Sequence, residues 1–375
     1  MKALLVLPIL LCVCLCVQGQ LRKQQFSFPN AGEYMVLKAD FHQHTVFSDG
    51  QVWPTVRVVE AYEEDLDIIA LSEHVEYRPH LNEFISHDHN HSFDLAQEEA
   101  KRYGVLLIRS AEVTRAMAPG HLNVIDIKDA NPLEKFVNKQ DSRDASTVIE
   151  TLEEARRQGG FIFWNHTAYP SKDNKSHWYP IHETLKNKGL MMGIEIVNGE
   201  RYEPIAFQWC LDYNLTILAN TDVHTTMAQK RSADNFKVMT LVLAKEKTKE
   251  AVMDALCEHR TVALWNNQLM GRKEHVEPIV GHGVVARLTR VSEEKGLFEI
   301  ENLTGMPFVF EFQELPEGFS IRNDVPCLVK ENSVSALGAS FKNGCPKTVK
   351  VKVKNVYVTP KQNLEMELPL VISER

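Results

Sequence analysis

Side chains of the types that can bind divalent metal ions are spread between residues 42 and 224 of this chain. They are nine histidines and acids: His42, His44, Asp49, His74, Glu112, His121, His166, Asp222 and His224. Imidazole nitrogens and carboxylate oxygens without thiolates suit Zn²⁺, Mn²⁺ or Fe²⁺. A set of this size predicts a site for more than one metal ion, and closely spaced metal ions are typical of hydrolases.

A lone histidine or acid is more often a hydrogen-bonded structural residue than a ligand. The joint occurrence of nine such residues changes that interpretation, because burying so many ionisable groups without a cation would cost much free energy. Two short pairs, His42-x-His44 and Asp222-x-His224, strengthen it. Alternate side chains of a strand share a face, so His42 and His44 would point the same way.

Apolar segments with strand character end in these candidate ligands. The segments are residues 36–44, 67–74, 105–112, 161–166 and 216–224. Segments with helical periodicity lie between them, at residues 54–64, 144–158 and 203–213. Strands that alternate with helices predict a parallel sheet, and α/β barrels build their active sites at the C-terminal ends of the strands. We therefore expect a barrel with a metal cluster in its mouth.

The motifs follow one another in a fixed order between residues 36 and 265. They are His42-x-His44, Ser48-Asp49-Gly50, Ser72-Glu73-His74, Glu112, Gly120-His121, Asn165-His166 and Asp222-x-His224. In this combination the chain resembles the PHP (polymerase and histidinol phosphatase) superfamily of metal-dependent phosphoesterases. One departure is visible, since the family usually has Thr-Asp-His where this chain has Ser72-Glu73-His74. The ligand histidine is kept, and only its neighbour changes.

The resemblance implies three metal ions in a distorted (β/α)7 barrel. The first ion would be held by His42, His44, Glu112 and Asp222. The second would be held by Asp49, His74 and His224. The third would be held by Glu112, acting as a bridge, together with His121 and His166. The cofactor is therefore expected to be two to three divalent transition metal ions, either zinc, manganese or iron.

The expected reaction is the hydrolysis of a small phosphate ester. A hydroxide between closely spaced cations is a nucleophile at neutral pH, and the same cations polarise phosphoryl oxygens. Glu112 and Asp222 would be the central acids of this site, while Arg115 and Arg201 are candidates to hold the substrate phosphate. Either arginine can equally be an ordinary surface residue. The histidine-rich segment 87–91 has the composition of a metal-binding tract, but it is rather expected in a solvated loop that overhangs the barrel mouth, where it could contact substrate.

The sequence pattern changes near residue 284. Segments with alternating apolar residues follow, separated by Gly, Pro and Asn turns, at residues 286–291, 297–300, 308–312 and 348–353. This pattern predicts a small antiparallel β-sandwich. The predicted domains are the metal-dependent barrel at residues 36–267 and the β-sandwich at residues 285–375. Cys327 and Cys345 of the latter could pair or remain free thiols.

The N-terminus has the pattern of a signal peptide at residues 1–19. An apolar run from Ala3 to Val17 follows Lys2, and small residues precede Gln20. The run is short for a membrane span, so we expect export to the periplasm, the cell surface or the medium, with no transmembrane segment in the mature chain. The formal net charge of −8 over 375 residues argues against nucleic acid as a partner.

Two functions from different classes fit the sequence. The first is an exported metal-dependent phosphoesterase that acts on a small phosphorylated substrate, either a monoester or a diester. The alternative is a non-catalytic protein whose barrel holds metal for structure while the β domain binds a surface glycan. Nine ligands favour the enzyme, because a structural metal site is closed and needs fewer. The sequence indicates no oligomeric state.

Overall fold

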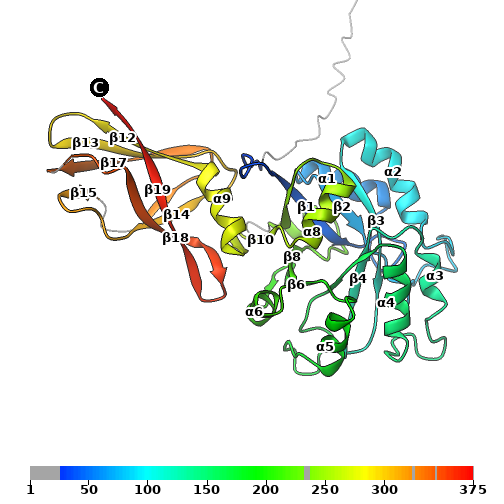
Figure 1. Ribbon diagram of the computed structural model, residues 1–375. Helices are drawn as coiled ribbons and strands as arrows, with labels where there is room; N and C mark the ends of the chain where they lie inside the picture. The colour runs from blue at the N-terminus through cyan, green and yellow to red at the C-terminus, as the bar shows by residue number, and fades with distance from the viewer. Residues whose placement is uncertain (1–25, 232–236, 323–325, 343, 375) are drawn as a thin grey trace, which may run out of the picture.

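The structure, a computed structural model, describes residues 26–231, 237–322, 326–342 and 344–374. Figure 1 shows two parts, an α/β part and a β part, with helix α9 (Lys273–Gly283) where they meet. The fold is thus an α/β barrel followed by an antiparallel β domain, as the sequence predicts. The expected signal peptide, residues 1–19, lies outside the described residues.

The α/β part is built on short, almost fully buried strands. They are β1 (Met35–Gln43), β2 (Ile68–Leu71), β3 (Leu106–Val113), β4 (Leu122–Ile125), β5 (Phe161–Trp164), β6 (Gly193–Asn198), β8 (Thr216–Asn220), β9 (Val238–Ala244) and β10 (Thr261–Trp265). Runs of β-branched and aromatic residues favour the extended backbone here. Each strand of the predicted set therefore exists, and a candidate ligand that the sequence placed at its end lies within three residues of that end.

The strand directions explain why the barrel is distorted. β1, β2 and β3 are parallel neighbours, and β6 is parallel to both β5 and β8. β4 is antiparallel to β3 and β5, and β9 is antiparallel to β1 and β10. The expectation of a parallel sheet is therefore only partly correct. The reversal at β4 returns the chain directly after Glu112, which brings His121 beside it.

Helices cover the outside of the barrel. The longer ones are α1 (Pro54–Glu63), α2 (His91–Tyr103), α4 (Val148–Arg157), α5 (Pro180–Asn187), α6 (Pro204–Asp212) and α8 (Lys249–Cys257). Proline at the first helical position favours the starts of α1, α5 and α6. The helix predicted at residues 144–158 begins only at Val148, because the Asp144 side chain accepts hydrogen bonds from Ser146 and Asn138 in a preceding turn.

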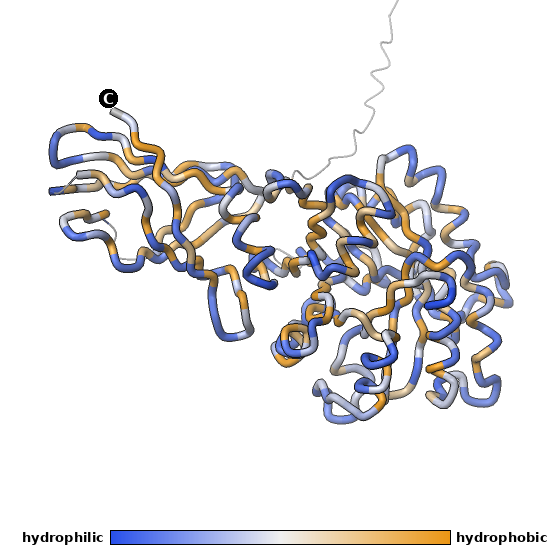
Figure 2. The backbone as a smooth tube through the Cα atoms, viewed as in Figure 1, coloured by the Kyte–Doolittle hydropathy of each residue, from blue (hydrophilic) through white to orange (hydrophobic). Residues whose placement is uncertain are grey.

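Apolar side chains from strands on all sides of the barrel meet in one buried cluster. Its members include Phe41 of β1, Ile68 of β2, Ile108 of β3, Phe163 of β5 and Leu218 of β8. Residues of α8 pack against the same cluster. Figure 2 shows apolar residues along the strands and polar residues along the outer helices and loops. Burial of this surface is the main favourable term that holds the strand ends in place.

The β part forms two packed layers of mostly antiparallel strands. They are β12 (Val284–Arg290), β13 (Lys295–Asn302), β14 (Phe308–Phe312), β15 (Phe319–Ile321), β16 (Cys327–Val329), β17 (Ser333–Phe341), β18 (Thr348–Thr359) and β19 (Gln362–Glu374). One pairing, β12 with β19, is parallel. Alternate residues such as Phe298 and Ile300 point into the shared core.

The two parts are joined by more than the connecting chain. Strand β11 (Gln268–Gly271) pairs with β10 of the barrel on one side and with β18 of the β domain on the other. Val276, Ile279 and Val280 of α9 are buried in the same apolar cluster as residues of both parts. Cys327 and Cys345 are free thiols, so the disulfide considered for them is not formed. In the described part of the chain, no helix has the length and apolar character needed to cross a membrane.

Candidate metal centre

The nine candidate ligands come together at one end of the barrel. His42 lies in β1 and Glu112 in β3, while His74, His166 and the pair Asp222 and His224 follow strands β2, β5 and β8. His121 precedes β4, which runs in the opposite direction, and so reaches the same end. Asp49 comes from the loop after β1. Strand ends that are distant in the sequence thus place nine metal-binding side chains around one cavity.

Four ligand atoms near β1 are spaced like those around a single ion. His42 Nε2 lies 3.1 Å from His44 Nε2 and 3.1 Å from Asp222 Oδ1. His44 Nε2 lies 3.2 Å from both Asp222 Oδ1 and Glu112 Oε2, and the His42 to Glu112 Oε2 distance is 3.3 Å. Ligand atoms bound tetrahedrally at their usual lengths would be about 3.3 Å apart. His42, His44 and Glu112 therefore fit one divalent ion, with Asp222 close to both imidazoles.

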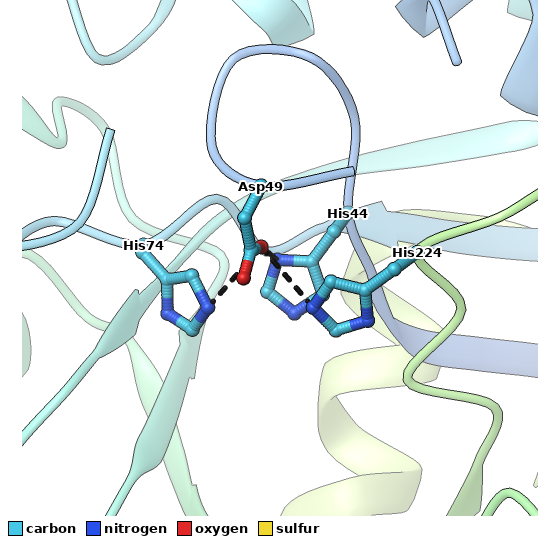
Figure 3. A group of neighbouring side chains, drawn as sticks. All are labelled: His44, Asp49, His74 and His224. Atoms are coloured by element: carbon cyan, nitrogen blue, oxygen red, sulfur yellow. Dashed lines mark ion pairs between the residues drawn. The ribbon is translucent and has the colours of Figure 1, made fainter. Parts of the chain in front are cut away.

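A second group surrounds the Asp49 carboxylate. Figure 3 shows His44, Asp49, His74 and His224, with the carboxylate of Asp49 among the imidazole rings. Asp49 Oδ1 lies 3.1 Å from His224 Nε2 and 3.4 Å from His74 Nε2. The rings of His44 and His224 stack with 4.3 Å between their centroids. These neighbours favour the charged carboxylate and hold the pKa of Asp49 below its usual range, although partial burial opposes the shift.

Glu112 lies between the groups and offers one oxygen to each side. Its Oε2 faces His42 and His44, as described, and is 3.1 Å from His74 Nδ1. Its Oε1 is 2.8 Å from His121 Nδ1 and 3.6 Å from His166 Nε2. Burial alone would raise the pKa of this carboxyl, but the surrounding imidazoles hold it well below the usual range. Glu112 is therefore a charged acid in a position to bridge two ions.

Several buried atoms in the centre have no well-directed hydrogen bond among the described residues. They are Asp49 Oδ1, Asp222 Oδ1 and His121 Nε2. An unsatisfied buried acceptor costs about 1–3 kcal/mol, and more if it is charged. Cations bound in the groups that contain these atoms would satisfy them. The donor set, its spacing and these atoms together fit divalent metal ions.

Glu195 of β6 holds one side of the centre and was not foreseen from the sequence. Its Oε1 accepts from His42 Nδ1 at 3.1 Å, and its Oε2 accepts from the His166 backbone N–H at 2.8 Å. The bond to Nδ1 leaves the Nε2 lone pair of His42 free to face an ion. The available signal was an acidic residue inside an otherwise apolar strand, residues 194–197.

Glu73, where the family usually has aspartate, reaches the loop that carries Asp49. Its carboxylate accepts hydrogen bonds from Thr45 Oγ1 at 2.5 Å and Ser48 Oγ at 2.6 Å. Ser48 Oγ lies 3.1 Å from His44 Nδ1, so the chain of contacts ends on a candidate ligand. A Cβ on Gly50 would lie 2.6 Å from the His44 carbonyl carbon, so this loop needs glycine there.

Arg57 of α1 joins the two strand ends that carry most of the first group. Its Nη2 donates to the carbonyl oxygens of His44 at 2.9 Å and Val223 at 3.1 Å, and its Nε also donates to His44 O. The side chain is fully buried, and its charge is balanced by Glu60 at 2.6 Å. Val223 lies between Asp222 and His224, so this one guanidinium fixes the spacing of three candidate ligands.

The two arginines expected to hold phosphate are both engaged by protein groups. Arg115 is fully buried, pairs with Glu76 and donates to Thr151 Oγ1 at 3.1 Å. The expectation that it binds substrate is therefore corrected, since its guanidinium faces protein groups. Arg201 lies beside the centre in a cavity of about 180 Å³ that also contains His166 and Asp222. Its side chain is engaged by Glu203 and by Asn174 O at 2.7 Å.

A cavity of about 380 Å³ opens onto the candidate ligands. Besides seven of them, its wall contains Tyr77, Thr114, Arg143 and Tyr169. Arg143 was missed because it lies in a polar segment with no regular pattern. The segment 87–91 does not overhang this cavity as expected. Instead its residues bond to the segment around α3 (Asn131–Glu134), as in the 3.2 Å contact of His89 Nε2 with Glu134.

Comparisons with known proteins include a solved structure that is similar over nearly the whole chain. Neither a scan of protein-family models nor a search of curated proteins finds a match. Among solved structures, a two-domain protein of Bacteroides vulgatus that contains a predicted PHP-like metal-dependent phosphoesterase is 37% identical, with a TM-score of 0.83. The alignment covers 93% of this chain and 99% of that one. A protein of Bifidobacterium adolescentis assigned as a metal-dependent phosphoesterase is 14% identical over 59% of this chain and 96% of its own, with a TM-score of 0.40.

Replacing Arg57 by lysine tests its role in spacing the ligands. Lysine keeps the charge but has no planar fork to reach both carbonyl oxygens, so we expect metal affinity to fall by about 10- to 100-fold. Competition with a chromophoric chelator measures this affinity. Arg102→Lys, on the exposed face of α2, is the matched control and should bind as the parent does. Unchanged affinity in a folded Arg57→Lys protein would contradict the role.

Metal binding should release protons at neutral pH. Burial alone would lower the pKa of His44, but hydrogen bonds and charge from Asp222 and Glu112 raise it to about 9 without metal. The pKa of His44 is thus higher in the metal-free fold than its unfolded value of about 6.5, so protonation of His44 stabilises that fold. This contribution is fully present below about pH 6.5 and is lost as pH rises through about 9. A metal ion must displace this proton, so its affinity should increase with pH up to about 9.

Calorimetry in two buffers of different ionisation enthalpy checks this expectation. At pH 7.5 the apparent binding enthalpies of Zn²⁺ should differ by an amount that corresponds to about one proton or more released per chain. Equal enthalpies in both buffers would mean that the imidazoles are already neutral.

Proposed function

This chain belongs to the family of PHP-like metal-dependent phosphoesterases, hydrolases that act on phosphate esters, and on this premise we propose that it hydrolyses small phosphate esters at a site of three divalent ions. The observation that supports the three-ion site best is the placement of Glu112. One of its oxygens lies within 3.3 Å of His42, His44 and His74, and the other within 3.6 Å of His121 and His166. A carboxylate shared in this way suits neighbouring cations.

The proposed ions are Zn²⁺, Mn²⁺ or Fe²⁺, which accept this mixture of imidazole and carboxylate ligands. When bound, such ions lower the pKa of water and neutralise charge on phosphoryl oxygens. The chain supplies the geometry. Glu195 fixes the ring of His42, Glu73 and Ser48 fix His44, and Arg57 fixes the strand ends, so the ligand atoms are placed before any ion arrives.

The wall of the 380 Å³ cavity provides the first contacts for a substrate. Arg143 offers a guanidinium for phosphate oxygens, and Thr114 a hydroxyl that already bonds His74 Nδ1 at 2.7 Å. Tyr77 and Tyr169 are about half-exposed and give the mouth two aromatic faces. A mouth of this size suits a small molecule better than a polymer, in line with the net charge of −8.

We also propose that the mature protein is exported, on the strength of its apolar N-terminal segment. This setting would separate it from histidinol phosphate, which is made in the cytosol, and from polymerase proofreading. Relation to phosphoesterases disfavours the alternative of a non-catalytic glycan-binding protein. The β domain is proposed as a support for the barrel, through β11, β18 and α9.

Hydrolysis of a generic aryl phosphate tests the proposal. Chelated protein should be inactive and should regain activity with Mn²⁺ or Zn²⁺, because the proposed reaction depends on bound ions to activate water. Glu112→Gln should lower kcat by about 100-fold or more, since it weakens two ion sites together. Glu98→Gln on the exposed face of α2 is the matched control and should remain fully active. A metal-replete protein that hydrolyses no phosphomonoester or phosphodiester would refute the proposed function.

A further inference from the structure

A second cavity, of about 570 Å³, adjoins the metal centre. The two share Arg143, and the second continues from Pro170, the neighbour of Tyr169 in the wall of the first. Of these two cavities, only the 380 Å³ cavity is lined by candidate ligands, so the second has no part in holding ions. A ligand that reached from one cavity into the other would pass Arg143.

The second cavity combines apolar walls with positive charge. Met117, Pro170 and Tyr179 supply carbon surface, and Arg143 and Lys172 supply cationic groups. The acid in the wall, Asp173, is already engaged by Ser171 Oγ at 2.6 Å and His177 Nε2 at 2.8 Å. Its hydrogen bonds lower the pKa of Asp173 to about 2. Asp173 is thus a charged acid whose oxygens already accept hydrogen bonds from protein groups.

Arg143 and Lys172 differ from the other cations near the centre. Arg57, Arg115 and Arg201 all donate to acids or carbonyl oxygens of the protein. Arg143 and Lys172 are exposed, and within the described ranges their side chains have no hydrogen bond or ion pair with another residue. The backbone of Arg143 is nevertheless fixed, since its carbonyl accepts from Ala116 N at 2.8 Å. Two cations without partners beside an anion-hydrolysing site favour a ligand that carries its own negative charge.

We propose that the preferred substrate is a phosphate ester whose alcohol carries a second anionic group, a carboxylate or a phosphate, bound by Arg143 and Lys172. This inference rests on the proposed function and adds the class of leaving group to it. The first phosphate lies over the ligand cluster, the carbon body lies against Met117 and Tyr179, and the second anion lies at Lys172. Arg143, which lines both cavities, contacts both ends.

Matched substrates test this proposal on the metal-loaded full chain. The esters are 3-carboxyphenyl phosphate and its neutral analogue 3-carbamoylphenyl phosphate, which differ little in size. A third ester with a second phosphate at the same ring position distinguishes the two kinds of anion. Release of inorganic phosphate gives kcat/KM for each. We expect the parent protein to prefer an anionic ester over the carbamoyl ester by about tenfold, with the preference falling as salt is raised.

Two variants test whether Lys172 and Arg143 cause the preference for an anionic ester. Lys172→Gln and Arg143→Gln should each bring the ratio between the anionic and the carbamoyl ester close to one. Lys175→Gln is the matched control, because Lys175 is exposed in the same segment and does not line the cavity, and it should keep the parent ratio. A ratio near one in the parent, with all esters hydrolysed, would overturn this inference and leave the proposed function standing. No hydrolysis of any ester would overturn both.

Discussion

The rest of the structure depends on the concentration of ionisable side chains at one end of an otherwise apolar barrel. Six histidines and three acids face one another with ligand atoms about 3 Å apart, and most of them are buried. Without cations, the protein can only share protons among them, which raises the pKa of His42 and His44 and lowers that of Glu112 and Asp222. Divalent ions would balance the charge of the same acids and bind the same imidazoles, and the spacing of the ligand atoms suits such bonds. Assembling these groups without a cation costs free energy. Binding of metal ions removes that cost and so contributes to metal affinity.

The surrounding residues make this arrangement rigid. The apolar cluster inside the barrel fixes the strands, while Glu195, Glu73 and Arg57 fix the ligand rings and the strand ends. Each of these three is a buried charge whose hydrogen-bonding groups are directed at protein atoms, which is how such groups are tolerated. The reversed strand β4 adds His121 to a site that parallel strands alone would not complete. Metal binding therefore requires little reorganisation of the fold.

Much of this arrangement could be predicted from the sequence, for a physical reason. A ligand at the end of an apolar strand has a local pattern, so the strands, the α/β barrel and the nine candidate ligands were recognisable. Partners that meet only in three dimensions have no such pattern. Arg115 was wrongly expected at the substrate because it lies close to Glu112 in the sequence, and the sequence does not reveal its partner Glu76. Arg143 was missed because it lies far from every candidate ligand in the sequence, although the fold places it in the wall of their cavity. Glu195 could have been found as a charge in an apolar strand. The division into domains at residues 267 and 285 stays a prediction.

We propose that these nine residues bind one cluster of divalent metal ions. A crystal structure of the protein loaded with Mn²⁺ or Zn²⁺, with an anomalous difference map recorded at the absorption edge of that metal, tests it most directly. Three peaks are predicted, each about 2.0–2.2 Å from its ligand atoms, with one between the two Nε2 atoms of His42 and His44 and with Glu112 touching two of them. A fully loaded crystal with no anomalous peak in this cavity, or with peaks only elsewhere on the surface, would contradict the account.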